Sequence, residues 1–274
     1  MRLGRPLSAP AVRSCPDIPS PFKEEGQGVG REYQFSLQGR GLIEPGAVFR
    51  ERDSAPGPEP PMPPALPARI LCLVTDRTMT GGDAGLVAAV SGAVAGGVNM
   101  VQLREKDLSH DELLRMARDL RKAIGDRTLL IVHGDPLAAA ESGADGVQLG
   151  EQAASVKEAR ETVGRDLLIG RSVHSAGGAA QAERGGADFL VLGAVFPSRS
   201  HPAGQTLGAA GVRQAAAGVR VPVIGIGGIT AVNAASVIAS GARGVAVISA
   251  ILSASSPEKA ARSLSAAIGL RDRA

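Results

Sequence analysis

The stretch LLIGRSVH (167–174) reads as an aliphatic strand that ends in polar side chains. Because side chains alternate across a strand, Ser172 and His174 share one face and Arg171 points to the other. A neutral imidazole at the end of a strand can carry a proton between two substrate atoms near pH 7. We therefore predict His174 as a catalytic acid–base residue and Ser172 as a substrate contact. The alternative is a hydrogen-bonded structural histidine.

A second polar group ends the stretch MVQLREKD. By the same alternation, Gln102, Arg104 and Lys106 share one face. Three polar side chains aimed the same way from a buried strand are costly without partners or a ligand. This cost favours a substrate-binding role for all three. The alternative is a set of ion pairs with the neighbouring acids Glu105 and Asp107.

Two glycine-containing or small-residue stretches, GIGGIT and AVISA, have the character of a phosphate site. Glycine lets the backbone approach an anion closely, and exposed N–H groups at the start of a following helix can bind phosphate. We predict phosphate contacts, mainly through the backbone, at Gly227, Gly228, Ile248 and Ser249. The polar loop GAVFPSRSHPAGQTLG adds further candidate substrate contacts, or else is an ordinary solvated loop. These candidates are Ser198 and Ser200.

Eight aliphatic runs recur from residue 70 onward, and most are separated by stretches with helical periodicity. The helical pattern is clear over 109–124 and 155–163, and Ser109 followed by Glu112 is the signature of a capping box. Joints such as SGADGVQLG and GGADFLVLG repeat, with a helix that ends at glycine directly before a strand. The runs are ILCLVTD (70–76), MVQLRE (100–105), LLIVHG (129–134), GVQLG (146–150), LLIGRSVH (167–174), FLVLGAVF (189–196), VPVIGIGG (221–228) and GVAVIS (244–249).

Alternation of strands and helices with short joints predicts βαβ units around a parallel sheet. Eight such units match a closed (β/α)₈ TIM barrel, which we expect to form a single domain over residues 67–274. An open doubly wound sheet is the rival fold, but it usually carries GxGxxG after its first strand, and LVTDRTMTGGDAG lacks that fingerprint. In a barrel the site forms where the strands end, so the polar residues above should meet at one rim.

Residues 1–66 differ from the rest of the chain, because most of the 18 prolines fall in this segment. Proline density of this kind opposes helices and central strands. We expect a disordered, proline-rich extension. A targeting segment and a misplaced start codon upstream of Met62 are the alternatives for residues 1–61.

Composition narrows the class of protein. Hydrophobic residues make up 44% of the 274 residues and aromatic residues 2%, so the core must be aliphatic, as in a buried parallel sheet. The net charge is +3, and the absence of a basic stripe with interleaved aromatics argues against nucleic acid. The apolar runs are too short for a membrane span. Cys15 and Cys72 lie far apart in the sequence, which favours a reducing cytoplasm over a disulfide.

Taken in order, these stretches resemble the thiamine-phosphate synthase/thiazole tautomerase family. The resemblance covers residues 70–268 and excludes the extension. It implies a TIM barrel and one of two activities. The stretches that carry it are VQLREKD, GADGVQLG, IGRSVHS, GADFLVLGAVFPS, IGIGGIT and GVAVISAI.

In the synthase branch of this family, magnesium holds a pyrimidine pyrophosphate, and the carbocation formed from it is captured by a thiazole phosphate. Its ligands are an Asp in an Asn-Asp pair after strand three and an Asp after strand four. Here His133 and Gly134 replace the pair, and Ala153 replaces the second Asp. Asp135 lies one position late and Glu151 two positions early. Because magnesium needs carboxylates, these substitutions argue against a metal, and His133 becomes a candidate substrate contact.

The tautomerase branch needs no metal and resembles this sequence in RSVHS, in VQL of strand four and in Gly134. The resemblance implies a 1,3-proton shift that aromatises a thiazole carboxylate phosphate. His174 would carry the proton, Arg104 would pair with the substrate carboxylate, and Gly228 with Ile248 and Ser249 would hold the phosphate. We therefore predict a cofactor-free isomerase acting on a small-molecule thiazole phosphate.

Two alternatives stay open. The first is a magnesium-dependent thiamine-phosphate synthase, because Lys106 completes the REKD motif of that branch. The second is a non-catalytic barrel that binds a phosphate ligand. A homo-oligomer is compatible with either, since the sequence does not fix the oligomeric state.

Overall fold

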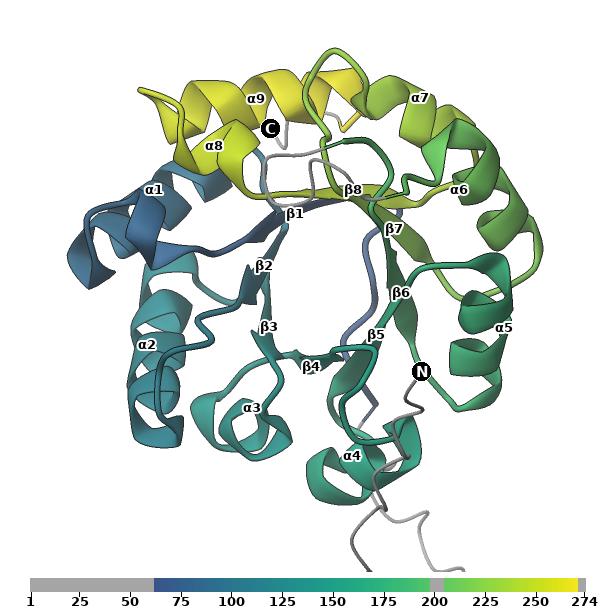
Figure 1. Cartoon of the computed structure of the whole chain (residues 1–274). Coiled ribbons are helices and arrows are strands. Elements are labelled where there is room, and N and C mark those ends of the chain that lie inside the picture. Colours follow the sequence, from purple (N-terminus) through teal and green to yellow (C-terminus); the bar gives the residue numbers. More distant parts are fainter. Residues whose placement is uncertain (1–61, 198–204, 271–274) are drawn as a thin grey trace, which may run out of the picture. The chain divides into compact units, whose positions relative to one another are not determined.

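The protein is a closed barrel of eight parallel strands that follow one another in chain order (Figure 1). The computed structural model describes residues 62–197 and 205–270. Each strand pairs with its two sequence neighbours, and β1 pairs with β8 to close the ring. This confirms the predicted (β/α)₈ fold. The strands are β1 (Ile70–Val74), β2 (Met100–Leu103), β3 (Leu129–His133), β4 (Gly146–Leu149), β5 (Leu168–Val173), β6 (Phe189–Leu192), β7 (Val223–Ile226) and β8 (Gly244–Val247).

Helices surround the barrel in Figure 1 and connect each strand to the next. Two short elements interrupt the simple alternation: a 3₁₀ helix η1 (Arg77–Met79) after β1, and α8 (Ser249–Leu252) directly after β8. The other helices are α1 (Asp83–Ala95), α2 (His110–Ile124), α3 (Pro136–Ser142), α4 (Val156–Val163), α5 (Ala176–Arg184), α6 (Gly208–Ala217), α7 (Ala234–Ala239) and α9 (Pro257–Ala267).

The local sequence signals account for where these elements begin and end. Ser109 caps α2, and its N–H donates to the Glu112 carboxylate at 2.8 Å, so the predicted capping box is present. Gly143 ends α3 in the left-handed conformation. One predicted run is too long: β6 stops at Leu192, and residues 193–196 form a loop.

Two apolar layers hold the barrel together. One lies between the strands and the helices and includes buried residues such as Leu71, Leu103 and Leu120. The other fills the barrel interior with every second strand residue, among them Met100 and Phe189. Such filling by alternate residues is typical of a TIM barrel and leaves no channel through it.

Charged residues at the amino-terminal ends of the strands are tied to the backbone. Asp145, just before β4, accepts the N–H of Leu130 in β3 at 2.7 Å and pairs with Arg121. Asp188, just before β6, repeats the arrangement with Ile169 in β5 and Arg160. We call these two sites the carboxylate clamps. They explain the repeated sequence GAD before strands four and six.

Asn99 takes the corresponding place before β2. Its side-chain oxygen accepts the N–H of Leu71 in β1 at 3.0 Å. Its side-chain nitrogen donates to the carbonyl of Arg69 at 2.8 Å. The neutral amide of Asn99 thus links β1 to β2, as the carboxylates of Asp145 and Asp188 link β3 to β4 and β5 to β6.

The predicted extension lies almost entirely outside the described part of the chain, which begins at residue 62, so its disorder remains a prediction. Barrel structure begins at Ile70. Among the helices of residues 62–197 and 205–270, none has the length and apolar character needed to span a bilayer. Cys72 is a buried free thiol in β1, and burial raises its pKa to about 12.

Candidate active site

The interior residues nearest the carboxyl ends of the strands form a layer that is polar on one side. We call it the upper layer. Strands β2 to β5 contribute hydrogen-bonding side chains to it, whereas β1 and β6 to β8 contribute apolar ones. A ligand above this layer would therefore meet hydrogen-bonding groups on one side only. The polar members are Gln102, His133, Gln148 and Ser172, and the apolar members are Val74, Val191, Ile226 and Ile248.

Gln102 and His133 are paired across β2 and β3. Gln102 is 5% exposed, and its Nε2 lies 3.3 Å from Nδ1 of His133. Because the amide nitrogen can only donate, Nδ1 accepts, and the ring proton of neutral His133 lies on Nε2. His133 is thus left with a donor for a ligand.

His133 is neutral at physiological pH. Burial, with the nearby positive charges of Arg104 and Lys106, lowers the pKa of His133 to about 4. A half-buried imidazole beside two cations is costly to protonate. The histidine therefore adds hydrogen-bonding capacity to the site and no charge.

Gln148 and Ser172 form the second polar pair of the upper layer. Gln148 Nε2 donates to Ser172 Oγ at 3.0 Å, which confirms that Ser172 faces the barrel interior. Oε1 of Gln148 is buried and has no partner among the described residues. Gly170 makes room for this amide, because a Cβ there would lie 2.1 Å from Oε1.

Arg104 and Lys106 follow β2 directly, as the sequence predicted. The backbone N–H of Arg104 donates to buried Thr75 Oγ1 at 2.9 Å, which ties the end of β2 to the end of β1. Within residues 62–197 and 205–270, neither side chain takes part in an ion pair or a side-chain hydrogen bond. Arg104 is half-buried and Lys106 is exposed. Both are available to an anion.

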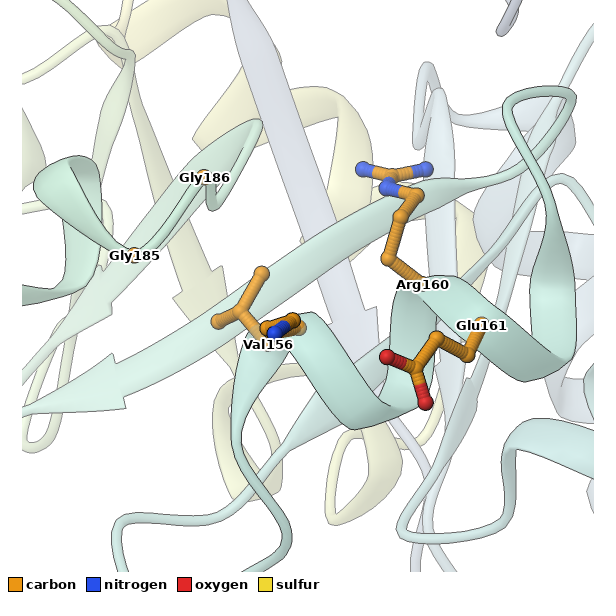
Figure 2. Close-up of a pocket in the computed structure, with 6 residues that line it drawn as sticks. Val156, Arg160, Glu161, Gly185 and Gly186 are labelled. Atoms are coloured by element: carbon orange, nitrogen blue, oxygen red, sulfur yellow. The ribbon is translucent and has the colours of Figure 1, made fainter. Parts of the chain in front are cut away.

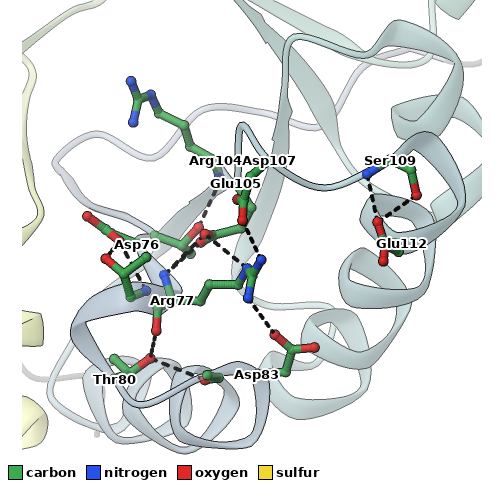
Figure 3. A network of polar contacts seen from close by, with 12 residues as sticks. Asp76, Arg77, Thr80, Asp83, Arg104, Glu105, Asp107, Ser109 and Glu112 are labelled. Carbon is green, nitrogen blue, oxygen red and sulfur yellow. Dashed lines mark hydrogen bonds and ion pairs between the residues drawn. The ribbon is translucent and has the colours of Figure 1, made fainter.

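The acids on either side of Lys106 are engaged elsewhere, so the alternative of an ion-pair set with Glu105 and Asp107 is not what the structure has. Both oxygens of buried Glu105 accept the backbone N–H of Arg77, at 3.1 and 3.2 Å. The Arg77 guanidinium pairs with Asp107. Figure 3 shows the Arg104 side chain extending away from this network.

His174 lies directly after β5 at the same rim. Its Nδ1 donates to the carbonyl oxygen of Gly193, and its Nε2 lies 3.5 Å from a carboxylate oxygen of Glu151. Both side chains are more than half exposed. Arg171 points away from the interior, as predicted, and donates to the carbonyls of Glu151 and Ala154. It holds the loop that carries Glu151.

The paired glycines after β7 are required by packing within the chain. Gly227 and Gly228 have φ of 101° and 62°. A Cβ on Gly228 would lie 2.4 Å from the carbonyl oxygen of Pro197 and 2.8 Å from Cβ of Phe196. From the sequence, these glycines were predicted only as phosphate contacts. Close packing against the loop after β6 is a second reason for glycine at these positions.

The remaining phosphate candidates lie beside the glycines. Ile248 occupies the cap position of α8, and exposed Ser249 is its first residue. Asn233 braces the loop directly after β7, because its Nδ2 donates to the carbonyl of Gly228 at 2.9 Å. The predicted contacts Ser198 and Ser200 lie outside the described residues.

Magnesium fits poorly at the positions where the resemblance places its ligands. In the described part of the chain, no three His, Cys, Asp or Glu side chains converge into a site that would hold a metal by protein side chains alone. Asp135 accepts the N–H of Ala138 at 2.9 Å and lies 2.7 Å from Nδ1 of His110. Both of its oxygens are thus used in capping α3 and in the histidine pair. Gly134 and Ala153 offer no ligand atoms from a side chain.

A surface pocket of about 340 Å³ lies apart from this rim (Figure 2). It is an outer recess between α4 and the turn that ends α5. None of its lining residues belongs to the upper layer or to the strand ends, so it does not extend the site. The lining residues are Val156, Lys157, Arg160, Glu161, Gly185 and Gly186.

Several positioning residues were not found from the sequence. Thr75, Gln148 and Asn233 are ordinary polar residues whose partners become visible only in the folded chain. A signal for Gln148 was nevertheless present. By the alternation of side chains along the strand, Gln148 faces the apolar barrel interior, and a buried glutamine needs a hydrogen-bonding partner.

The sequence profile of a family described as thiamine monophosphate synthase matches residues 71–251. A putative thiamine-phosphate synthase of Geobacter sulfurreducens is 43% identical over 206 residues, covering 74% of this chain and 96% of the relative. The thiamine-phosphate synthase of Chlorobium luteolum is 43% identical over 202 residues, covering 72% and 92%.

A solved structure, thiamine phosphate pyrophosphorylase from Pyrococcus furiosus, matches with a TM-score of 0.67 and 33% identity, covering 74% of this chain and 96% of that one. These relatives carry the name of a synthase, and the prediction of an isomerase is therefore wrong. That prediction gave the substitutions at His133, Gly134 and Ala153 more weight than the similarity of the whole barrel. The profile match and these relatives show that the chain belongs to the thiamine monophosphate synthase family.

Proposed function

We propose that this protein is a thiamine-phosphate synthase, a transferase that joins a pyrimidine methyl diphosphate to a thiazole phosphate. The observation that carries the proposal is similarity to relatives of that name over more than nine-tenths of their length. In the reaction, the bond between the pyrimidine methylene carbon and the diphosphate oxygen breaks, and its electron pair leaves with diphosphate. The thiazole nitrogen then forms the new bond to that carbon with its own lone pair.

The rim offers groups for each part of this reaction. Arg104 and Lys106 would bind the diphosphate, since guanidinium and ammonium groups are the usual phosphate ligands of proteins. Gln102 and His133 would meet the polar edge of the pyrimidine from the upper layer, with Ser172 beside them. The Nε2 proton of His133 suits an acceptor on that ring.

The thiazole phosphate would bind on the opposite side, where β7 and β8 end. Backbone N–H groups around Gly227, Gly228, Ile248 and Ser249 would hold it, with Asn233 fixing the loop. Binding of this kind after the last two strands is common in TIM barrels. Ser198 and Ser200 remain proposed substrate contacts.

His174 loses the role that the isomerase prediction gave it. The proposed reaction moves no proton on the thiazole ring, because the attacking nitrogen has a free lone pair. We propose His174 as a substrate contact at the rim, where Nε2 beside Glu151 can donate to an anion when protonated. The polar side chains of the upper layer support a small-molecule substrate, and a cytoplasmic location remains a proposal.

The test is a product assay on the purified chain with both substrates and magnesium. Thiamine phosphate and diphosphate should appear in equal amounts, measured by chromatography. Gln102→Ala should lower kcat/KM by roughly tenfold or more, the loss expected for a buried polar contact to substrate. A folded protein that forms no thiamine phosphate would refute the transferase and leave the non-catalytic phosphate-binding barrel.

A further inference from the structure

The positions expected to supply magnesium ligands lack suitable side chains in this chain. Gly134 has no side chain, and Ala153 is an exposed methyl group. The loop SRSHPAG (198–204) contains no acidic residue in its sequence either. The acids nearest in sequence to these positions are Asp135 and Glu151, and Asp76, after β1, is used in accepting the N–H and hydroxyl of Thr78.

Asp135 is committed to the local fold. Although burial by itself raises the pKa of Asp135, hydrogen bonds from the Ala138 N–H and from His110 hold it below its ordinary value. The same contact raises the pKa of His110. Moving the carboxylate to a metal would uncap α3 and break this pair.

Glu151 is a single exposed carboxylate with a histidine beside it. Its oxygen lies 3.5 Å from His174 Nε2, and the side chain is 61% exposed. Magnesium is usually bound through one or two carboxylates plus substrate phosphates, in an octahedral arrangement. One solvated carboxylate leaves nearly the whole coordination shell to water and substrate, which makes weak binding the expectation.

The cations at the end of β2 offer another way to balance the charge of a diphosphate. Arg104 and Lys106 directly follow β2, which pairs with the strand that carries His133, and their positive charges lower the pKa of His133. The nearest acids in sequence, Glu105 and Asp107, bind Arg77 and point elsewhere (Figure 3). Two cations are thus held at the rim without an acidic partner among the described residues.

We infer that this site binds its diphosphate ligand directly through Arg104 and Lys106, with no magnesium–carboxylate site to hold it. The inference rests on the proposed function for the identity of the ligand class, a diphosphate. The cations of REKD are shared with the synthase branch, and the departure is the loss of the two acidic metal ligands, which leaves the cations alone to hold the diphosphate. Fixed charges also predict that the affinity falls as salt increases.

The test measures binding of inorganic pyrophosphate to the full chain by titration calorimetry, once with EDTA and once with magnesium. Because magnesium also binds pyrophosphate in solution, affinities are compared at equal concentrations of free pyrophosphate. We expect the same Kd in both conditions and a weaker one at high salt. Arg104→Gln and Lys106→Gln should each weaken binding, by roughly 10- to 100-fold for the arginine.

Matched controls lie on helices away from the rim. Lys122→Gln, near the end of α2, and Arg262→Gln, on α9, remove the same charges and should leave Kd unchanged. Circular dichroism and thermal unfolding establish that each variant is folded. These controls separate a local contact from a general effect of net charge.

A gain of function gives the sharper comparison. In the double variant Gly134→Asp/Ala153→Asp, both acids return, and pyrophosphate binding should become stronger with magnesium than with EDTA. Gly134 has φ of 82°, which Asp and Asn tolerate better than other side chains, and a Cβ there meets nothing within 4 Å. Gly134→Asn/Ala153→Asn is the uncharged control and should show no metal effect.

Binding that appears only with magnesium would overturn the inference, and loss of that binding in Glu151→Gln would place the ion at Glu151. A folded protein that binds no pyrophosphate in either condition would overturn it as well. The product assay is independent of both results. Metal-free pyrophosphate binding without thiamine phosphate formation would refute the proposed function and leave this inference standing.

Discussion

The two rims of the barrel use charge in opposite ways. At the amino-terminal rim, Asp145 and Asp188 each bind a strand N–H and an arginine, so both carboxylates are paired within the chain. At the carboxyl-terminal rim, Arg104 and Lys106 have no charged partner within the described residues, although acids flank them in sequence. Charged side chains that stabilise the fold are paired within the chain, whereas charged side chains that bind a ligand have no charged partner in the chain.

The carboxyl-terminal rim nevertheless contains one fully structural ion-pair network. Arg77 and Glu105 join the loop after β1 to the end of β2, and they lie on the outer side of the strands that carry Arg104. The same segment REKD therefore alternates between cations that have no acidic partner in the described part of the chain and acids that support the fold. The comparison of the rims can be tested by removing one charge of each kind.

The largest effect on stability is expected at Glu105, where the side chain is 3% exposed. Glu105→Ala leaves the Arg77 N–H without its buried acceptor and removes the carboxylate that lies 3.9 Å from Nε of Arg77, and should lower the free energy of unfolding by about 3 kcal/mol or more. KM for the diphosphate substrate should rise too, because Arg104 loses its support. Urea unfolding and steady-state kinetics measure the two effects. Asp107→Asn removes an exposed acid from the same arginine and should cost less than about 1 kcal/mol.

A smaller loss is expected at the amino-terminal rim. Asp188→Ala removes the acceptor for the Ile169 N–H and the partner of Arg160, and should lower the free energy of unfolding by about 2 kcal/mol. Activity per folded molecule should stay unchanged, because the clamp is at the far end of the strands. Glu258→Gln, in an exposed helical pair, is the control and should cost about 0.5 kcal/mol or less. A drop in kcat for Asp188→Ala would break the division between the rims.

The smallest effect is a pH dependence at His133. Its folded-state pKa lies below the unfolded value, so the unfolded chain takes up a proton first as the pH falls. Stability is therefore fully present above about pH 6.5 and is lost between about pH 6.5 and pH 4, by roughly 2 kcal/mol at pH 5. His133→Asn should remove this loss, which urea unfolding at pH 7 and pH 5 would measure.

His110 provides the opposite sign for the same experiment. Its pKa is raised by Asp135, so its contribution to stability is present below the unfolded value and is lost as the pH rises through the folded one. Compared with the unsubstituted protein, His110→Gln should show a larger fall in stability from pH 7 to pH 5, whereas His133→Asn should show a smaller one. Equal pH profiles for the two variants would show that the two histidines do not differ in environment.

Much of the fold was predictable because its signals are local. Strand runs, the capping box at Ser109 and the glycine joints each depend on a few adjacent residues, and the structure confirms them. The inward face of Gln102 and Ser172 followed from strand parity. The partners of these residues did not, because Gln148 and Ser172 are 24 positions apart and meet only when β4 pairs with β5.

The activity was mispredicted for a different reason. The lack of acids at positions 134 and 153 was taken as evidence for one of two reactions. That lack concerns only how the anionic substrate is bound. Similarity to synthases extends over the whole barrel, and a ligand set can change while the reaction stays the same. The roles of Gly227 and Gly228 show a related limit, because glycine fits both an anion and the neighbouring loop.

The carboxylate clamps and Asn99 all join an odd-numbered strand to the even-numbered strand after it. Three neighbouring strand pairs, β1–β2, β3–β4 and β5–β6, are thus each linked by a side chain in addition to the backbone ladder. New chain ends opened between β4 and α4 would leave each of these links and both arginines of the clamps in place, whereas ends opened just before β4 would free Asp145. A circular permutant of this protein should accordingly be cut between these strand pairs and not within one.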